Sequence, residues 1–124
     1  MKKILLSFLF VFFSISMNAQ NIIERETIQN NPNTLSVYSN QDVAILSNNF
    51  SGINENQKKD LYRVFYKKYK TLVANRTNDE IIELVDTTKS EIKNILGNDL
   101  YTRVSQNNQI FNRLTGSIYL NTNN

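Results

Sequence analysis

The clearest helix signal lies in residues 54–74, which read NENQKKDLYRVFYKKYKTLVA. Asn54 is a residue type that caps helices, and Gln57 follows three positions later, as a capping box requires. At 100° per residue, the apolar and aromatic side chains fall on one face, formed by Leu61, Val64, Phe65, Tyr69 and Leu72. The pattern predicts an amphipathic helix that begins at Asn54 and runs to about Ala74.

A second helix is predicted after a short link. Thr77 is its expected cap, and Glu80 occupies the matching capping-box position. Its apolar stripe consists of Ile81, Leu84, Val85, Thr88, Ile92, Ile95 and Leu96. The short link favours an antiparallel pair. Such a hairpin would bring three lysines that end the first helix, Lys67, Lys68 and Lys70, near three acids that begin the second, Asp79, Glu80 and Glu83.

A third helix is predicted from Asn98 onward, before Gly116, with an apolar stripe of Leu100, Val104, Phe111 and Leu114. The three glycines of the chain each lie just outside a proposed helix, where glycine is common: Gly52, Gly97 and Gly116. We therefore expect an all-α fold with three main helices, an antiparallel hairpin plus a third helix. This helical domain covers residues 51–116, and residues 117–124 form a tail.

The first 19 residues have the pattern of a secretory signal peptide. Two lysines precede an apolar run from Ile4 to Ile15, and Ala19 offers a cleavage site before Gln20. We therefore expect a periplasmic or secreted protein with no membrane span after cleavage. Without the two leader lysines the formal net charge falls from +3 to +1, which disfavours a nucleic-acid partner.

Residues 20–50 are expected to form a flexible N-terminal arm, because they are polar and contain the only proline, Pro32. Within this arm, residues 35–38 are a candidate strand or extended segment. Residues 41–47 are a candidate short helix.

The absence of Cys, His and Trp from the sequence limits its chemistry. Disulfides, His-assisted nucleophiles and zinc sites built from His or Cys are excluded. The single acidic cluster, Asp79, Glu80, Glu83 and Asp86, is a candidate weak calcium site or acid/base pair. It lacks EF-hand spacing, however, and acids in a first turn ordinarily stabilise the helix N-terminus. We expect no cofactor, no metal and no enzymatic activity.

The most distinctive surface candidate lies on the helix at residues 54–74. Its apolar and aromatic positions cover an arc of roughly 200°, wider than one packing partner usually needs. One interpretation is a partner-binding face rimmed by cations and formed by Tyr62, Arg63, Tyr66, Tyr69, Lys70 and Val73. The alternative is a central helix that packs against two neighbours and exposes only a strip of lysines.

Residues 50–57 read FSGINENQ, and a charged and apolar helix follows them. This segment resembles the Leu-Thr-x-x-Gln helix start of the Spy and CpxP family of small periplasmic proteins, with Asn54 in place of the motif Thr. A second copy of the motif would fall at residues 96–100, LGNDL, where Gly97, Asn98 and Leu100 replace its Thr, Pro and Gln. The resemblance implies an exported, helical, non-enzymatic protein. In that family, thin helical dimers hold unfolded clients or a sensor domain.

Together these features predict an exported non-enzymatic binding protein that engages a protein partner or an unfolded client. A chaperone or sensor-binding protein similar to Spy and CpxP is the first hypothesis, and a homodimer is compatible with it. The alternatives are a specific inhibitor or immunity-type partner protein and a secreted structural protein. A carboxylate-based enzyme acting on glycans is disfavoured, because no paired acids occupy a cleft motif.

Overall fold

The computed structural model describes residues 32–74 and 76–120, and all regular structure in these ranges is helical. The elements are α2 (Pro32–Asn49), α3 (Glu55–Leu72), α4 (Asn78–Leu96), α5 (Asn98–Ser105), α6 (Asn108–Thr115) and the 3₁₀ turn η1 (Ser117–Tyr119). The predicted all-α class is confirmed. The expected signal peptide, residues 20–31 of the expected arm and residues 121–124 of the expected tail lie outside the described residues.

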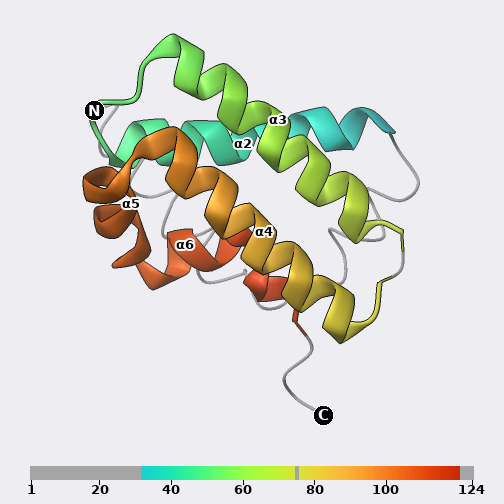
Figure 1. Cartoon of the computed structure of the whole chain (residues 1–124). Helices are drawn as coiled ribbons and strands as arrows, with labels where there is room; N and C mark the ends of the chain where they lie inside the picture. Colours follow the sequence, from blue (N-terminus) through green and yellow to red (C-terminus); the bar gives the residue numbers. More distant parts are fainter. Residues whose placement is uncertain (1–31, 75, 121–124) are drawn as a thin grey trace.

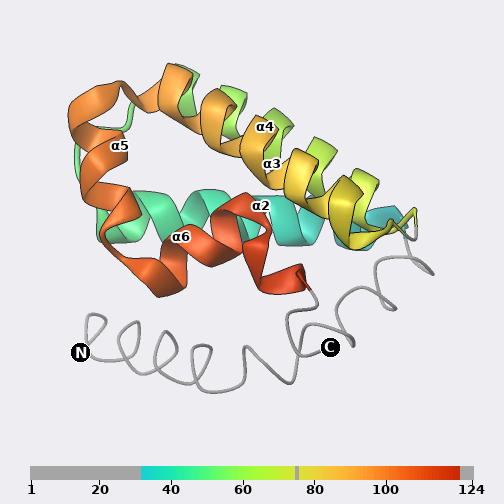
Figure 2. The same cartoon turned by 60° about the horizontal axis from the view of Figure 1, so that its bottom comes forward.

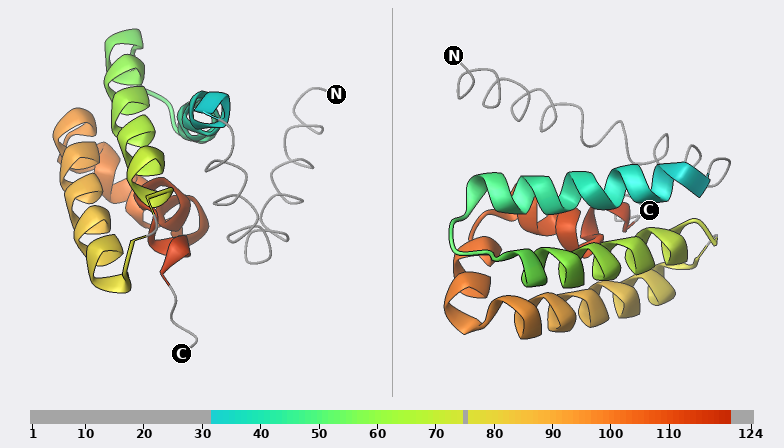
Figure 3. Two further views of the ribbon diagram at one scale, coloured as in Figure 1. Left: turned by 90° about the vertical axis from the view of Figure 1, so that its right-hand side faces the viewer. Right: turned by 90° about the horizontal axis from the view of Figure 1, so that it is seen from above.

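Four helices surround the core as a closed ring. In the order α2, α3, α4 and α6, each helix contacts the next, and α6 contacts α2 again. Figure 1 shows α3 and α4 as an antiparallel hairpin, with α2 behind α3. Figure 2 shows two layers, with α3 and α4 above α2 and α6, and with α5 carrying the chain from one layer to the other. Figure 3 gives the same arrangement from the end and from above, with α3 between α2 and α4.

The two predicted helix starts are confirmed in atomic detail. Asn54 Oδ1 accepts a hydrogen bond from the Gln57 backbone N–H (2.8 Å), and Gln57 Oε1 accepts one from the Asn54 N–H (2.9 Å). Thr77 and Glu80 form the corresponding reciprocal pair at the start of α4. The predicted apolar face of α3 is buried at all five positions, Leu61, Val64, Phe65, Tyr69 and Leu72. Local capping and periodicity therefore define the hairpin.

Lys67 and Lys68 do not form the expected ion pairs with the acids at the start of α4. Lys67 pairs with Glu91 in the second half of α4, and Lys68 pairs with the buried Asp42 of α2. Lysine has a long, flexible side chain, so its position on a helix does not determine which carboxylate it reaches.

The single third helix expected from Asn98 onward is wrong, because the structure has two helices, α5 and α6, separated at residues 106–107. Asn107 caps α6, since its Oδ1 accepts a hydrogen bond from the Ile110 N–H (3.1 Å). Asn competes for backbone hydrogen bonds in this way and therefore favours caps over helix interiors. The break lets α6 return beneath α4, so that Ile110 and Leu114 enter the core beside Val104.

The expectation of a flexible arm is wrong for residues 32–49, which form the 18-residue helix α2. The candidate strand at 35–38 and the short helix at 41–47 are both parts of this longer helix. Its buried positions are Leu35, Ser39, Asp42 and Leu46, which have helical spacing. Two of these four residues are polar, so the apolar periodicity that would reveal the helix is absent from the sequence.

In the described part of the chain the apolar core has two clusters, one toward each end of the α3–α4 hairpin. The first includes Leu46, Leu61, Phe65, Ile92 and Val104. The second includes Leu35, Tyr69, Leu72, Ile81, Val85 and Tyr119. The expected tail is therefore wrong for residues 117–120: Tyr119 is buried, and its ring meets that of Tyr69 edge to face at 6.5 Å between centroids. None of the helices within residues 32–120 has the length and apolar character needed to cross a membrane.

We predict that Gly97→Ala lowers the free energy of unfolding by about 1–3 kcal/mol, because Gly97 joins α4 to α5 at φ 85° and ψ 165°, a region that is almost restricted to glycine. An added Cβ would meet no atom within 4 Å, so the cost comes from the backbone alone. Urea unfolding measures it, with the exposed neighbour changed in Asn98→Ala as the control. Equal stability of the two variants would contradict the prediction.

Candidate functional site

The six residues predicted to form a partner-binding face do not share one surface. Arg63 and Lys70 are exposed, whereas Tyr62, Tyr66 and Val73 are half-buried. Tyr69 is 0% exposed, so the prediction that it belongs to an exposed partner-binding face is wrong. The wide arc of α3 reflects its position between α2 and α4, which cover it from two sides. The alternative interpretation of the arc, a central helix with two neighbours, therefore accounts for most of it.

Tyr69 belongs to a buried polar group that we call the Asp42 cluster, formed by Asp42, Lys68, Tyr69 and Arg113. Lys68 Nζ donates to Asp42 Oδ2 (2.5 Å), and Arg113 Nε donates to Asp42 Oδ1 (2.8 Å). Tyr69 Oη donates to the same Oδ1 (3.0 Å). All four side chains are 0–1% exposed. The cluster joins α2, α3 and α6 inside the ring.

The two cations of the Asp42 cluster outnumber its carboxylate, and the C-terminal end of α6 supplies the remaining negative potential. Lys68 Nζ donates to the backbone carbonyls of Arg113 (2.9 Å) and Leu114 (3.0 Å). These carbonyls lie at the negative end of the helix dipole. The same ammonium also lies over the rings of Phe65 and Tyr69. Because its groups bind one another inside the core, we assign the cluster a structural role.

The sequence analysis did not predict the Asp42 cluster, since Asp42 falls in the expected arm and Lys68 was expected to face the acids at the start of the second helix. We predict that Asp42→Ala lowers the free energy of unfolding by about 3–5 kcal/mol, because it leaves two buried cations without their counter-ion. Chemical denaturation measures the loss. The exposed Asn48→Ala on the same helix is the control, and a similar small effect of both changes would refute the structural role.

Among the described residues, two surface hollows are considered as accessible sites. The first, which we call the α2–α3 groove, has a volume of about 460 Å³ and is lined by Asn40, Val43, Glu55, Lys58, Lys59, Tyr62 and Arg63. It contains two of the predicted residues, Tyr62 and Arg63. Tyr62 is held in place by a hydrogen bond between its Oη and Ser36 Oγ (2.9 Å). The groove thus combines a fixed aromatic ring with several cations.

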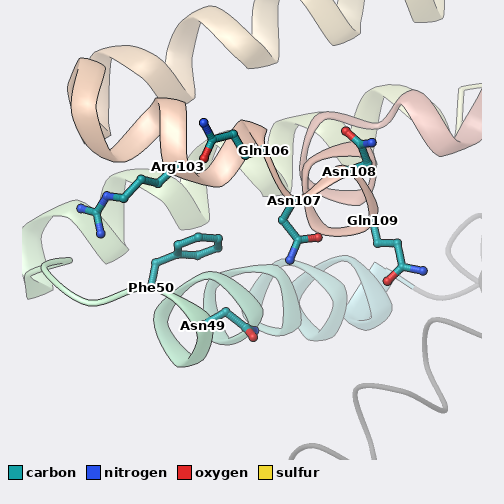
Figure 4. Close-up of a pocket in the computed structure, with 7 residues that line it drawn as sticks. All are labelled: Asn49, Phe50, Arg103, Gln106, Asn107, Asn108 and Gln109. Atoms are coloured by element: carbon teal, nitrogen blue, oxygen red, sulfur yellow. The ribbon is translucent and has the colours of Figure 1, made fainter.

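The second hollow, which we call the amide hollow, has a volume of about 540 Å³ and is open to solvent. It lies where the end of α2 meets the junction of α5 and α6 (Figure 4). Its lining consists of Asn49, Phe50, Arg103, Gln106, Asn107, Asn108 and Gln109. Sequence reasoning missed this site. The only signal was the density of Asn in these two segments, which the whole chain shares.

We assign to the acidic cluster at the start of α4 the stabilisation of the N-terminus of this helix. Its four members, Asp79, Glu80, Glu83 and Asp86, are all exposed. Hydrogen bonds from Thr77, chiefly from its backbone N–H, hold the pKa of Glu80 below its usual value of 4.5. Within residues 32–74 and 76–120, no three or more acidic side chains are grouped closely enough to hold a metal ion.

The lowered pKa of Glu80 predicts a pH dependence of stability. The folded-state pKa lies below the unfolded value, so Glu80 stabilises the fold above about pH 4.5. This contribution is lost as the pH falls through the folded-state pKa. We expect the Tm advantage of the wild type over Glu80→Gln to shrink between pH 6 and pH 3 (about the range in which carboxylates titrate).

Thermal unfolding across this pH range provides the measurement. Glu83→Gln removes one carboxylate from the same helix outside the capping box, and its Tm difference from the wild type should change less with pH. A constant Tm difference for Glu80→Gln would contradict the assigned role.

Compared with family models, with curated proteins and with solved structures, the chain matches none of them.

Proposed function

We propose that this protein is an exported, non-enzymatic binding protein that recognises one dedicated protein partner through the α2–α3 groove. The main observation in support of this proposal is that Tyr62 and Arg63 line this groove together with Lys58 and Lys59. Export is supported by the signal-peptide pattern of residues 1–19. This proposal corresponds to the inhibitor or immunity-type alternative predicted from the sequence.

Tyr and Arg are the residue types that most often dominate the binding energy of protein interfaces. Here the tyrosine is already restrained, because its hydroxyl is bonded to Ser36 and its ring lies 5.9 Å from that of Tyr66. A side chain fixed before binding loses less conformational entropy when a partner arrives. Tyr62 is therefore well suited to anchor an incoming side chain.

The charge of the α2–α3 groove indicates the chemistry of the partner. Three cations and one carboxylate line it. Lys58 pairs with Glu55, and Arg63 pairs with Asp60, each at 3.2 Å. Both ion pairs are exposed, and exposed ion pairs contribute little free energy. Lys59 forms no ion pair within the described residues. An acidic partner segment would meet cations that are easily redirected toward it.

The resemblance to the Spy and CpxP family supports a second candidate, the holding of unfolded clients. That activity requires apolar surface. In the described part of the chain, only two large hydrophobic side chains are exposed, Val37 (50%) and Ile82 (47%). They lie on different helices, α2 and α4, so we place a dedicated partner ahead of general client binding.

The test is capture of a partner from an envelope extract on the immobilised protein, followed by titration of the purified partner. We expect Lys59→Gln combined with Arg63→Gln to weaken binding of the partner by tenfold or more, which corresponds to about 1.4 kcal/mol. The control combines Lys89→Gln and Lys93→Gln on α4, which remove the same charge outside the groove. This control should bind as the wild type does.

Equal weakening by both double variants would remove the α2–α3 groove from the interaction. Suppression of aggregation of a denatured model client by a several-fold excess of the protein, with no stoichiometric partner captured, would favour the chaperone hypothesis instead.

A further inference from the structure

The amide hollow is separate from the α2–α3 groove in its lining and chemistry. Five of its seven lining residues carry side-chain amides, namely Asn49, Gln106, Asn107, Asn108 and Gln109. Figure 4 shows Asn49 on α2 near Phe50, and the other four at the end of α5 and the start of α6, with Asn108 and Gln109 beyond Asn107 as seen from Phe50. The hollow therefore presents a concentration of neutral polar groups that the fold gathers from two distant parts of the chain.

Two of the amides are oriented by bonds to the backbone. Asn49 Nδ2 donates to the Ile45 carbonyl (2.7 Å), which leaves its Oδ1 to accept a hydrogen bond from a ligand. Asn107 Oδ1 accepts from the Ile110 N–H, which leaves its Nδ2 to donate. The amides of Gln106, Asn108 and Gln109 form no hydrogen bond within the described residues. Donors and acceptors are thus both available to a ligand.

Arg103 is the single charged residue of the lining, and no carboxylate lies beside it there. It forms no ion pair with any residue in the described ranges. A guanidinium favours carboxylates, which it can bind through two parallel hydrogen bonds. Phe50 is half-buried against the first core cluster and also lines the hollow, so it offers part of an aromatic ring to a ligand.

We propose that the amide hollow binds a short saccharide that carries a carboxylate group. Sugar hydroxyls both donate and accept hydrogen bonds, as do the amides that line the site. The carboxylate would bind Arg103, and the ring of Phe50 would cover an apolar face of the sugar. The volume of about 540 Å³ falls within the range of about 300–1,000 Å³ usual for ligand sites.

An acidic peptide is the competing ligand, but the lining favours a saccharide. Peptide recognition relies on apolar pockets for side chains in addition to contacts with the backbone. Phe50 is the only apolar residue of the lining, so the hollow offers little to a peptide side chain. A saccharide needs no such pocket, because its edges are covered with hydroxyl groups.

The test is an NMR titration of the purified protein with a galacturonic acid trisaccharide and, in parallel, with the neutral galactose trisaccharide. We expect the acidic sugar to shift the side-chain amide signals of Asn49, Asn107 and Gln109. Arg103→Gln should weaken binding of the acidic sugar by about tenfold. It should leave the weaker binding of the neutral sugar unchanged. Arg76→Gln, which removes a cation outside the hollow, should have no effect on either sugar.

Three results would overturn the proposal while the variants remain folded by circular dichroism. These are no binding of the acidic sugar at millimolar concentration, equal affinity for the two sugars, or tighter binding of an acidic hexapeptide at the same amides. The combined Lys59→Gln and Arg63→Gln variant should bind the sugar as the wild type does. Failure of the α2–α3 groove proposal is thereby distinguished from failure of this one.

Discussion

The fold depends on one buried carboxylate that binds two cations. Asp42 accepts hydrogen bonds from Lys68 and Arg113, which lie on helices 26 and 71 positions further along the chain. Charges removed from water are tolerated only when their partners satisfy them, so separating α2, α3 and α6 would leave buried charges without partners. Helix α2 is thereby fixed against α3, and the α2–α3 groove with Tyr62 is a direct product of that contact.

The hairpin of α3 and α4 could be predicted because its signals are local. Capping boxes at Asn54 and Thr77 and a regular apolar face need no tertiary information. Helix α2 could not be predicted in the same way, since Ser39 and Asp42 occupy half of its buried face and read as surface residues. The break between α5 and α6 at Asn107 could not be predicted either. In a chain rich in Asn, the sequence does not distinguish an Asn that caps a helix from one that does not.

The candidate sites show the same limit of sequence reasoning. Periodicity placed Tyr62 and Tyr69 on one wide arc, but it could not tell which part of the arc a neighbouring helix would cover. Tyr69 points into the core, whereas Tyr62 lines the α2–α3 groove. The amide hollow combines residues 49–50 with residues 103–109, which only the return of α6 brings together. No pattern within either segment predicts that meeting.

The closure of the ring by α6 has a consequence for the order of events during synthesis. Asp42 and Lys68 leave the ribosome first, and the α6 carbonyls that Lys68 requires follow 45 positions later. Until then helices α2, α3 and α4 carry a charged pair that water solvates better than the unfinished interior does. The nascent chain is therefore expected to remain open until α6 emerges, and a chain that stays open can still be threaded through a narrow translocation channel.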